Sequence, residues 1–410
     1  MATDTTTGGR ALVVGLGVSG MATALRLRQI GWTPVVVERA ARRRAGGYFI
    51  AMFGPGLASA RRLGILDRLE NKNAGGVSFD VDRAGRRKPA LSFQDFPGPP
   101  WLMRRGDLEQ AAYTALPDDV EIRYGTEPTA IAQDADGVDV TLTDGAGDTV
   151  TERFDLVVGA DGLRSTVRRL VFGPHERHLR RLDHMAVAFQ LPGPLPGHRG
   201  DDGVIMLEPG RSMWVFPFRD NPPTVLLNYR TDDVDAEFTR PLEQRLREVF
   251  GPEPTGAALG AALDALGSAD NVLFDSVEQV HLDSWQRGRV VLVGDAAWCV
   301  TLYSGMGASS GMAGADLLGT MLARHPRDLP AALAGWERRL RPHIEFLQHN
   351  GQQMRNLFVP PHRGQILLRR IIVRLSRFPL TAPLMTMVRD RGKVGRMMRA
   401  DFAHPDPVYA

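Results

Sequence analysis

Short apolar runs separated by a glycine turn open the chain. Residues 11–14 form an apolar run of strand composition, and glycines recur through the turn at residues 15–20. Residues 21–30 then place apolar side chains at helical spacing, and a second apolar run at residues 35–37 ends on Glu38. This change of period predicts a strand, a turn, a helix and a second strand.

The glycines of this turn have the spacing of a dinucleotide-binding βαβ unit. Gly15 permits the tight turn, Gly17 lets a pyrophosphate approach the backbone, and Gly20 lets helix and strand pack closely. The helix start around Val18 and Ser19 offers free amides and the positive end of its dipole to that pyrophosphate. The turn therefore predicts a bound adenine dinucleotide.

Charged residues follow the second strand. Glu38 stands near the position, about 20 residues after the turn, that is expected for the acid that binds a ribose. Arg39 and Arg44 belong to an arginine-rich stretch that leads into Gly46 and Gly47. Two interpretations stay open, because these arginines either lie in a solvated loop or bind cofactor phosphates or a docking nicotinamide donor.

Two further apolar strands end in glycine turns that carry an aspartate. The first turn contains Asp161 and the second contains Asp295, and Gly305, Met306 and Gly307 then open a helix of small residues. In an open α/β sheet, ligands bind outside the carboxyl ends of the strands. Three such ends predict one extended cofactor.

Between residues 176 and 284, proline-rich turns separate strand-like runs, with one helix-like segment at residues 241–250. This pattern predicts an antiparallel sheet inserted into the first domain. Trp214, Phe216 and Tyr229 lie on the predicted strands and are candidates for core packing or for substrate contact. The runs are residues 185–191, 204–207, 213–218, 224–229 and 272–280.

The tail predicts two helices. Residues 331–347 form the first, with a potential break at Pro342. Residues 365–378 form the second, with leucines and isoleucines on one face and arginines on the other. A basic amphipathic helix packs on its own domain or lies on a membrane surface, and packing is the expectation here.

Composition narrows the class of protein. The 410 residues are 43% hydrophobic and 24% charged, which is ordinary for a globular protein, and the net charge of +3 does not indicate nucleic acid. Cys299 is the only cysteine, so an intramolecular disulfide is impossible and a reducing, cytoplasmic location is expected. We expect no signal peptide, no transmembrane segment and no metal site.

Together these stretches resemble the single-component (group A) FAD-dependent monooxygenases, the aromatic hydroxylase superfamily that includes tetracycline-modifying enzymes and actinomycete polyketide hydroxylases. The resemblance implies an α/β fold with a Rossmann-like FAD-binding domain, an inserted antiparallel β-sheet substrate domain and a helical C-terminal segment. The expected boundaries are 1–175 and 285–345 for the FAD-binding domain, 176–284 for the substrate domain and 346–410 for the C-terminal segment.

The resemblance also implies roles for single residues. The turn glycines and Glu38 would hold the ADP half of FAD, and Arg105 would contact the cofactor. Asp161 belongs to a motif associated with FAD and the nicotinamide donor, and Asp295 would bind the ribityl chain. Gly305, Met306 and Gly307 would lie against the isoalloxazine and the pyrophosphate.

Two positions depart from the family pattern. Trp298 stands where many members have histidine, and Leu302 stands where many have proline. Both are expected at the wall where dioxygen and substrate meet the flavin ring. No catalytic acid or base is assigned.

The resemblance implies that NADPH or NADH reduces FAD and that dioxygen then supplies one oxygen atom to an aromatic or polycyclic, largely apolar substrate, in secondary metabolism or antibiotic modification. One alternative is an FAD-dependent oxidase, dehydrogenase or reductase without oxygen insertion, and another is a flavin-binding protein without turnover. A plain nicotinamide dehydrogenase is disfavoured because it has no use for Asp295. We expect a monomer or a homodimer.

Overall fold

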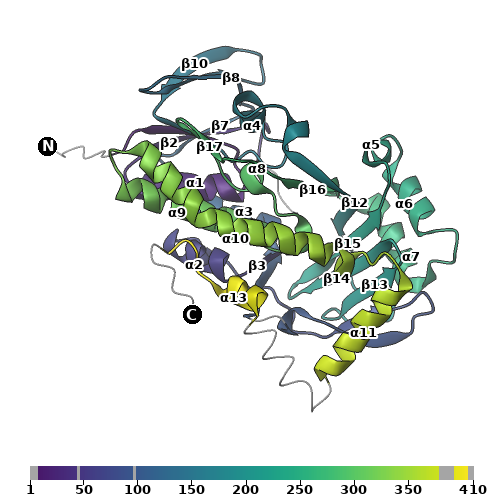
Figure 1. Ribbon diagram of the computed structural model, residues 1–410. Helices are drawn as coiled ribbons and strands as arrows, with labels where there is room; N and C mark the ends of the chain where they lie inside the picture. The colour runs from purple at the N-terminus through teal and green to yellow at the C-terminus, as the bar shows by residue number, and fades with distance from the viewer. Residues whose placement is uncertain (1–7, 44–46, 96–97, 378–391, 405–410) are drawn as a thin grey trace.

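The computed structural model describes residues 8–43, 47–95, 98–377 and 392–404. Its centre is a parallel sheet in the order β18, β11, β1, β2 and β7, with the short β17 added antiparallel at the edge (Figure 1). The predicted strand–helix–strand unit is confirmed as β1, α1 and β2. These strands are β1 (Arg10–Val14), β2 (Thr33–Glu38), β7 (Glu121–Tyr124), β11 (Leu156–Gly159), β17 (Gln286–Arg287) and β18 (Val290–Leu292).

Helices cover this sheet and bury its apolar strands. In the β1–β2 register Val13 pairs with Val36, and both side chains are fully buried. α9 packs against α1, α2 and α10, α3 packs against α1, and α4 packs against β11 and β18. These helices are α1 (Val18–Gln29), α2 (Gly54–Arg62), α3 (Arg105–Ala115), α4 (Thr166–Val171), α8 (Asp295–Trp298), α9 (Gly307–Arg324) and α10 (Leu329–Phe358).

A second sheet of seven strands has the order β16, β12, β15, β14, β13, β4 and β5. The five strands predicted between residues 176 and 284 are present and pair antiparallel. β4 and β5 come from residues 78–90 and join through a parallel pair between β4 and β13. The strands are β4 (Ser78–Val81), β5 (Arg87–Ala90), β12 (Leu179–Gln190), β13 (Gly203–Glu208), β14 (Arg211–Phe218), β15 (Asn221–Arg230) and β16 (Leu273–Val280).

Three helices, rather than the one expected from the sequence, interrupt these strands. They are α5 (Val234–Glu237), α6 (Leu242–Phe250) and α7 (Gly256–Ala265). Leu246 and Phe250 of α6 and Leu259 of α7 are buried against one face of the sheet. These helices therefore cover one face of the seven-stranded sheet and leave its opposite face to contact other parts of the protein.

Smaller elements complete the fold. β8 (Glu127–Gln133), β9 (Val138–Thr143) and β10 (Thr149–Phe154) form an antiparallel meander, and β3 (Phe49–Met52) pairs with β6 (Trp101–Arg104). α11 (Arg363–Arg377) contacts β5 and β13, and α13 (Lys393–Arg399) contacts α2. The 3-10 helices are η1 (Leu66–Arg68), η2 (Phe93–Asp95), η3 (His175–Arg177), η4 (Leu266–Ser268) and η5 (Leu302–Ser304). Among the described residues, no helix has the length and apolar character needed to cross a bilayer.

The break suggested at Pro342 is wrong, because Pro342 lies inside α10, a continuous helix of 30 residues. Proline removes one backbone hydrogen bond from a helix interior and disfavours the turn before it. Trp336, Leu340 and Ile344 are fully buried on the same helix. This packing on both sides of Pro342 stabilises the continuous helix.

The half-buried His281 is expected to make the stability of the protein fall at acid pH. Burial lowers the pKa of His281 to about 4, so the unfolded chain binds more protons than the folded chain between about pH 6.5 and pH 4. This contribution to stability is complete above the unfolded pKa and falls as the pH drops through that window, by at most about 1.4 kcal/mol per pH unit. Urea unfolding of His281→Gln between about pH 7 and pH 5 should therefore show a weaker pH dependence than the parent protein.

The exposed His349 provides the matched control for that experiment. His349→Gln should keep the pH dependence of the parent protein. If His281→Gln has the same pH dependence as the parent protein, His281 has the same pKa in the folded and unfolded chains, which would contradict the prediction.

Candidate active site

The glycine turns found in the sequence meet at one edge of the central sheet. β1, β2, β11 and β18 run parallel, so their carboxyl ends share that edge. The backbone N–H of Gly15 donates to the carbonyl of Val37 at 2.8 Å, which joins the first turn to the end of β2. The backbone N–H of Ala160 donates to the carbonyl of Val14 at 2.8 Å, which brings in the end of β11.

The three turn glycines serve different packing needs. Gly15 has a φ of 103°, and a Cβ on Gly20 would lie 1.9 Å from the carbonyl oxygen of Gly15. Both positions therefore exclude larger residues. A Cβ on Gly17, in contrast, would meet nothing within 4 Å. Gly17 thus borders open space at the N-terminus of α1, as expected for a position that approaches a pyrophosphate.

Gly17→Val is expected to weaken FAD binding about tenfold or more while leaving the melting temperature of the apoprotein unchanged. The new side chain would enter space that is empty of protein atoms but needed by the cofactor, and tenfold corresponds to about 1.4 kcal/mol. Fluorescence titration with FAD measures the change. Gly193→Val is the matched control, because Gly193 also borders open space with no left-handed φ. Equal FAD affinity in both variants would contradict the role of Gly17.

The Ser19 side chain of α1 packs against the turn before α8 and against α9. A Cβ on Gly294 would lie 2.2 Å from the Ser19 hydroxyl, and a Cβ on Gly311 would lie 2.4 Å from it. The Ser19 side chain therefore fills the space between the turn before α8 and the start of α9. A contact of Ser19 with the cofactor stays a prediction, and it would use the backbone of the α1 N-terminus rather than the hydroxyl.

The Glu38 side chain contacts the backbone of the first glycine turn. Its carboxylate accepts hydrogen bonds from the backbone N–H of Leu16 at 2.9 Å and of Ala40 at 2.8 Å. This position at the end of β2 matches the one expected for the ribose acid. Arg39 is exposed, Val18 is half-buried at the first position of α1, and Arg44 lies outside the described residues.

Arg105, Tyr48 and Asp295 approach one another from three elements. The backbone N–H of Arg105 donates to the carbonyl of Tyr48 at 2.9 Å, and its side chain pairs with Glu109 at 2.8 Å. Burial raises the pKa of the Tyr48 hydroxyl, against the effect of Arg105 and with a further contribution from Asp295. The structure thus brings the predicted Arg105 and Asp295 together and adds Tyr48.

Asp295 is the first residue of α8 and directly follows Gly294. Its side chain is accessible to solvent. Burial among protein atoms nevertheless raises the pKa of its carboxyl, while Arg105 and the Cys299 thiol act in the opposite direction. The carboxylate is therefore accessible to a ligand although protein atoms lie around it. A polar ligand such as the ribityl chain fits there, because the carboxylate can accept its hydroxyl groups.

Asp161 has a structural role within its own motif. Its carboxylate accepts a hydrogen bond from the Ser165 hydroxyl at 2.6 Å and from the backbone N–H of Val167 at 3.1 Å, at the start of α4. Arg168 is fully buried and donates to the carbonyl of Ala296 at 2.8 Å. This contact ties the Asp161 turn to α8, so Asp161 supports the position of the next motif.

The start of α9 completes the edge. Gly305 has a φ of 66° and is exposed, Met306 is buried, and a Cβ on Gly307 would meet nothing within 4 Å. Gly307 therefore borders open space in the same way as Gly17. Two helix N-termini, of α1 and α9, border the space available to a cofactor.

An aromatic cluster links this edge to the seven-stranded sheet. The cluster consists of Phe49, Phe216, Trp214, Phe358 and Tyr303. Phe49 stacks on Phe216 with ring centroids 4.2 Å apart, Trp214 lies 4.6 Å from Phe358, and Phe358 lies 5.2 Å from Tyr303. The predicted candidates Trp214 and Phe216 thus share one face of the sheet.

The structure does not bring Tyr229 into this cluster. Trp214 pairs with Leu226 on β15, so the even-numbered residues of β15 share its face, and Tyr229 points to the other side. There its hydroxyl donates to Glu237 at 2.8 Å. The proposed substrate contact of Tyr229 is wrong for this geometry, because strand alternation sends it into the core beneath α6 and α7.

The expectation that Trp298 lies at the wall of the flavin site is also wrong. Its indole is fully buried, 4.7 Å from Trp285 and 5.9 Å from Trp336. A Cβ on Gly314 would lie 2.7 Å from this indole, so the glycine makes room for it. Leu302 is partly exposed on η5, close in sequence to Gly305, and its place at the wall of the flavin site stays a prediction.

Sequence reasoning missed three residues at this edge. Tyr48 follows the noted Gly46–Gly47 pair, and Tyr303 lies between two recognised motifs, so their positions were the available signals. Thr301 has a φ of 70°, a strained conformation for a β-branched residue. Such strain is concentrated at functional sites, but no sequence pattern predicts it.

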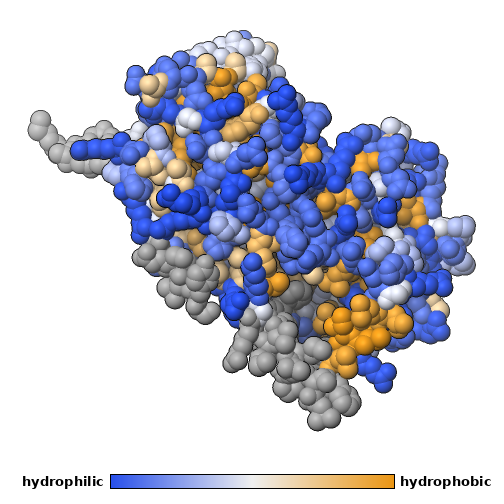
Figure 2. Space-filling model, viewed as in Figure 1, coloured by the Kyte–Doolittle hydropathy of each residue, from blue (hydrophilic) through white to orange (hydrophobic). Residues whose placement is uncertain are grey.

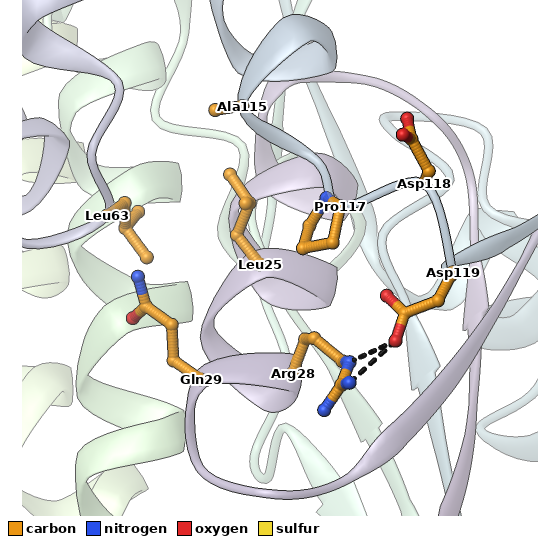
Figure 3. Close-up of a pocket in the computed structure, with 8 residues that line it drawn as sticks. All are labelled: Leu25, Arg28, Gln29, Leu63, Ala115, Pro117, Asp118 and Asp119. Carbon is orange, nitrogen blue, oxygen red and sulfur yellow. Dashed lines mark hydrogen bonds and ion pairs between the residues drawn. The ribbon is translucent and has the colours of Figure 1, made fainter.

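A separate surface pocket of about 530 Å³ lies at the opposite end of α1 (Figure 3). Arg28 and Asp119 form an ion pair of 2.6 Å at its rim. Leu25, near the end of α1, also lines it, whereas the glycine turn precedes the first residue of that helix. This pocket is therefore distinct from the edge described above.

Comparison with known proteins agrees with this geometry. A family model described as FAD binding domain matches residues 9–333. The uncharacterized protein Rv1260 of Mycobacterium tuberculosis is 32% identical over 356 residues, covering 82% of this chain and 89% of that protein. The FAD-dependent monooxygenase asL4 of Sarocladium schorii is 29% identical over 372 residues, covering 83% of this chain and 85% of that protein.

Solved structures share the fold. The tetracycline destructase Tet(55) superposes with a TM-score of 0.73 at 24% identity, covering 95% of this chain and 98% of that chain. Klebsiella pneumoniae HpxO, complexed with FAD and uric acid, superposes with a TM-score of 0.72 at 20% identity, covering 94% and 98%. The chain belongs to the FAD binding domain family and is a flavin-dependent (group A) monooxygenase, an oxidoreductase.

Proposed function

We propose that this enzyme uses NADPH or NADH and dioxygen to oxygenate an aromatic or polycyclic small molecule. The observation that carries the proposal is the aromatic cluster directly beside the residues suited to hold FAD. One oxygen atom of dioxygen would enter the substrate, the other would leave as water, and the nicotinamide would supply the two electrons.

The residues at the sheet edge fit FAD. Gly17 and the amides of the α1 N-terminus would bind the pyrophosphate, Glu38 the ribose and Asp295 the ribityl hydroxyls. Arg105 and the segment from Gly305 to Gly307 would lie beside the ring system. When bound, FAD supplies the redox chemistry and the reaction with dioxygen.

The aromatic cluster supports a flat, largely apolar substrate. Trp214 and Phe216 would offer ring faces for stacking, and the apolar surroundings would exclude water from the reacting atoms. The Tyr303 hydroxyl is buried and has no hydrogen-bond partner among the described residues. It would be available to donate to an oxygen atom of the substrate. Tetracycline destructases and the uric acid complex of HpxO carry names of ring-shaped molecules, which agrees with this class.

The rest of the chain fits the same proposal. Residues 1–175 and 285–345 would form the FAD-binding domain, except for β4 and β5, which pair with the sheet of residues 176–284 and would belong with it to the substrate domain. Residues 346–410 would form the C-terminal segment. The substrate would then bind between the FAD-binding domain and the substrate domain, and α10 would contact both domains.

An anaerobic reduction experiment tests the proposal. We expect the purified protein to show a flavin absorbance band that bleaches with NADPH or NADH and returns with air. In the presence of polycyclic phenols, label from ¹⁸O₂ should appear in the product. A band that cycles without label in any product would instead indicate an oxidase or reductase, which is the alternative that Leu302 favours.

A further inference from the structure

Helix α11 packs on the protein through a face other than its leucine and isoleucine face. Its buried residues are Ile366, Arg369 and Val373, spaced as one side of a helix. The face of Ile366, Arg369 and Val373, rather than the leucine and isoleucine face, therefore meets the seven-stranded sheet.

A buried ion pair fixes this orientation. Arg369 lies 3.5 Å from Asp80 of β4, and both side chains are almost fully buried. The Arg369 guanidinium also lies 5.1 Å from the centre of the Trp214 ring. Turning the helix over would leave the Asp80 carboxylate buried without its cation, which is strongly unfavourable.

The outward face of α11 is apolar. Leu367, Leu368, Ile371 and Ile372 are 59%, 56%, 47% and 46% exposed. They cover an arc of about 140° at 100° per residue. Figure 2 shows the resulting orange patch at the position of α11. We name these four residues the α11 patch. An exposed apolar patch of this kind marks an interaction site.

The positive charges around the α11 patch indicate what kind of surface it binds. α11 contains no acidic residue. Arg363, Arg370 and Arg374 follow one row along the helix at one margin of the patch, and Arg363 and Arg374 are exposed. In a twofold dimer through this face, the arginines of two copies would gather at one interface and repel. An anionic lipid surface instead matches both the apolar side chains and the cations.

We propose that the α11 patch docks on an anionic lipid surface, with α11 lying in the plane of the interface. The arginine row contacts the lipid headgroups, and the leucines and isoleucines enter the boundary with the acyl chains. Because Arg369 of the same helix contacts Trp214, docking places the aromatic cluster one helix away from the lipid. A lipid-dissolved substrate then has a short route to the site.

Vesicle flotation with the full-length, FAD-loaded protein tests this proposal. We expect binding to vesicles of phosphatidylcholine mixed with phosphatidylglycerol, weaker binding to phosphatidylcholine alone, and loss of binding in high salt. Leu368→Gln/Ile372→Gln should lower the vesicle-bound fraction about tenfold or more. Val150→Gln/Val272→Gln, at exposed apolar positions elsewhere, is the matched control and should bind like the parent protein.

Three outcomes would overturn the proposal. The first is no binding to either vesicle, and the second is equal binding by the patch variant. The third is a dimer in lipid-free sedimentation that the patch variant abolishes, since the patch would then join two copies of the chain. Thermal melts and flavin spectra of both variants separate a folding defect from a lost surface, and these readouts do not depend on which substrate the enzyme oxygenates.

Discussion

Asp295→Ala is expected to weaken FAD binding about 10- to 100-fold and to abolish turnover. A hydrogen bond to a charged group contributes roughly 1.5–3 kcal/mol, and about 1.4 kcal/mol corresponds to a factor of ten in affinity. The Asp295 carboxylate is accessible to solvent and lies near Arg105 and Tyr48. Its removal therefore takes away the acceptor expected for the ribityl hydroxyls without removing a core side chain.

Equilibrium titration of the apoprotein with FAD measures this effect, and NADPH consumption at saturating FAD measures turnover. Asp232→Ala is the control, because the Asp232 side chain is 96% exposed and remote in sequence from every glycine turn. A variant at Asp295 that retains full flavin content and activity would refute the assignment of this site.

Asp316→Ala is expected to destabilise the fold by about 3–5 kcal/mol, the usual cost of removing one partner from a buried ion pair. The Asp316 side chain is completely buried in α9 and binds Arg62 of α2 at 2.6 Å and Arg26 of α1 at 3.3 Å. Alanine leaves the partly buried guanidinium groups of Arg26 and Arg62 without this carboxylate, and Arg62 keeps only its ion pair with Asp401. The substitution therefore removes the ion pairs that join α9 to α1 and α2.

Urea unfolding of the apoprotein measures that loss. Asp119→Ala removes an acid from an exposed ion pair with Arg28 and should leave the unfolding midpoint within experimental error. Asp316→Asn keeps the shape and part of the hydrogen bonding, so its midpoint should lie between those of the parent and Asp316→Ala. If Asp316→Ala unfolds like the parent protein, the two arginines find other partners and the ion pair is not needed.

The cofactor edge could be predicted because its signals are local. Glycine spacing, apolar runs and the acid after β2 are properties of short segments, and parallel strands necessarily bring their carboxyl ends to one edge. Arg105 and Asp295 lie near each other at this edge, and their contacts with the cofactor stay predictions. Tyr48 and the strained Thr301 were missed because their roles arise from neighbours that are distant in sequence.

The substrate side was predicted only in part. The strands of the second sheet follow from alternation and proline-rich turns, and Trp214 and Phe216 do share one face. Tyr229 lies on the other face because the register between β14 and β15 decides which positions align. Trp298 lies in the core because Gly314, on another helix, leaves space for its indole.

By itself, the sequence determined the βαβ unit, the three glycine turns, the antiparallel strands and the two-faced character of residues 365–378. Each of these depends on residues within a few turns or strand repeats of one another. Only the tertiary structure decided which face of α11 meets the protein. A helical period separates the faces but cannot choose between them, and here the choice follows from Asp80, nearly three hundred residues away, whose buried carboxylate requires Arg369.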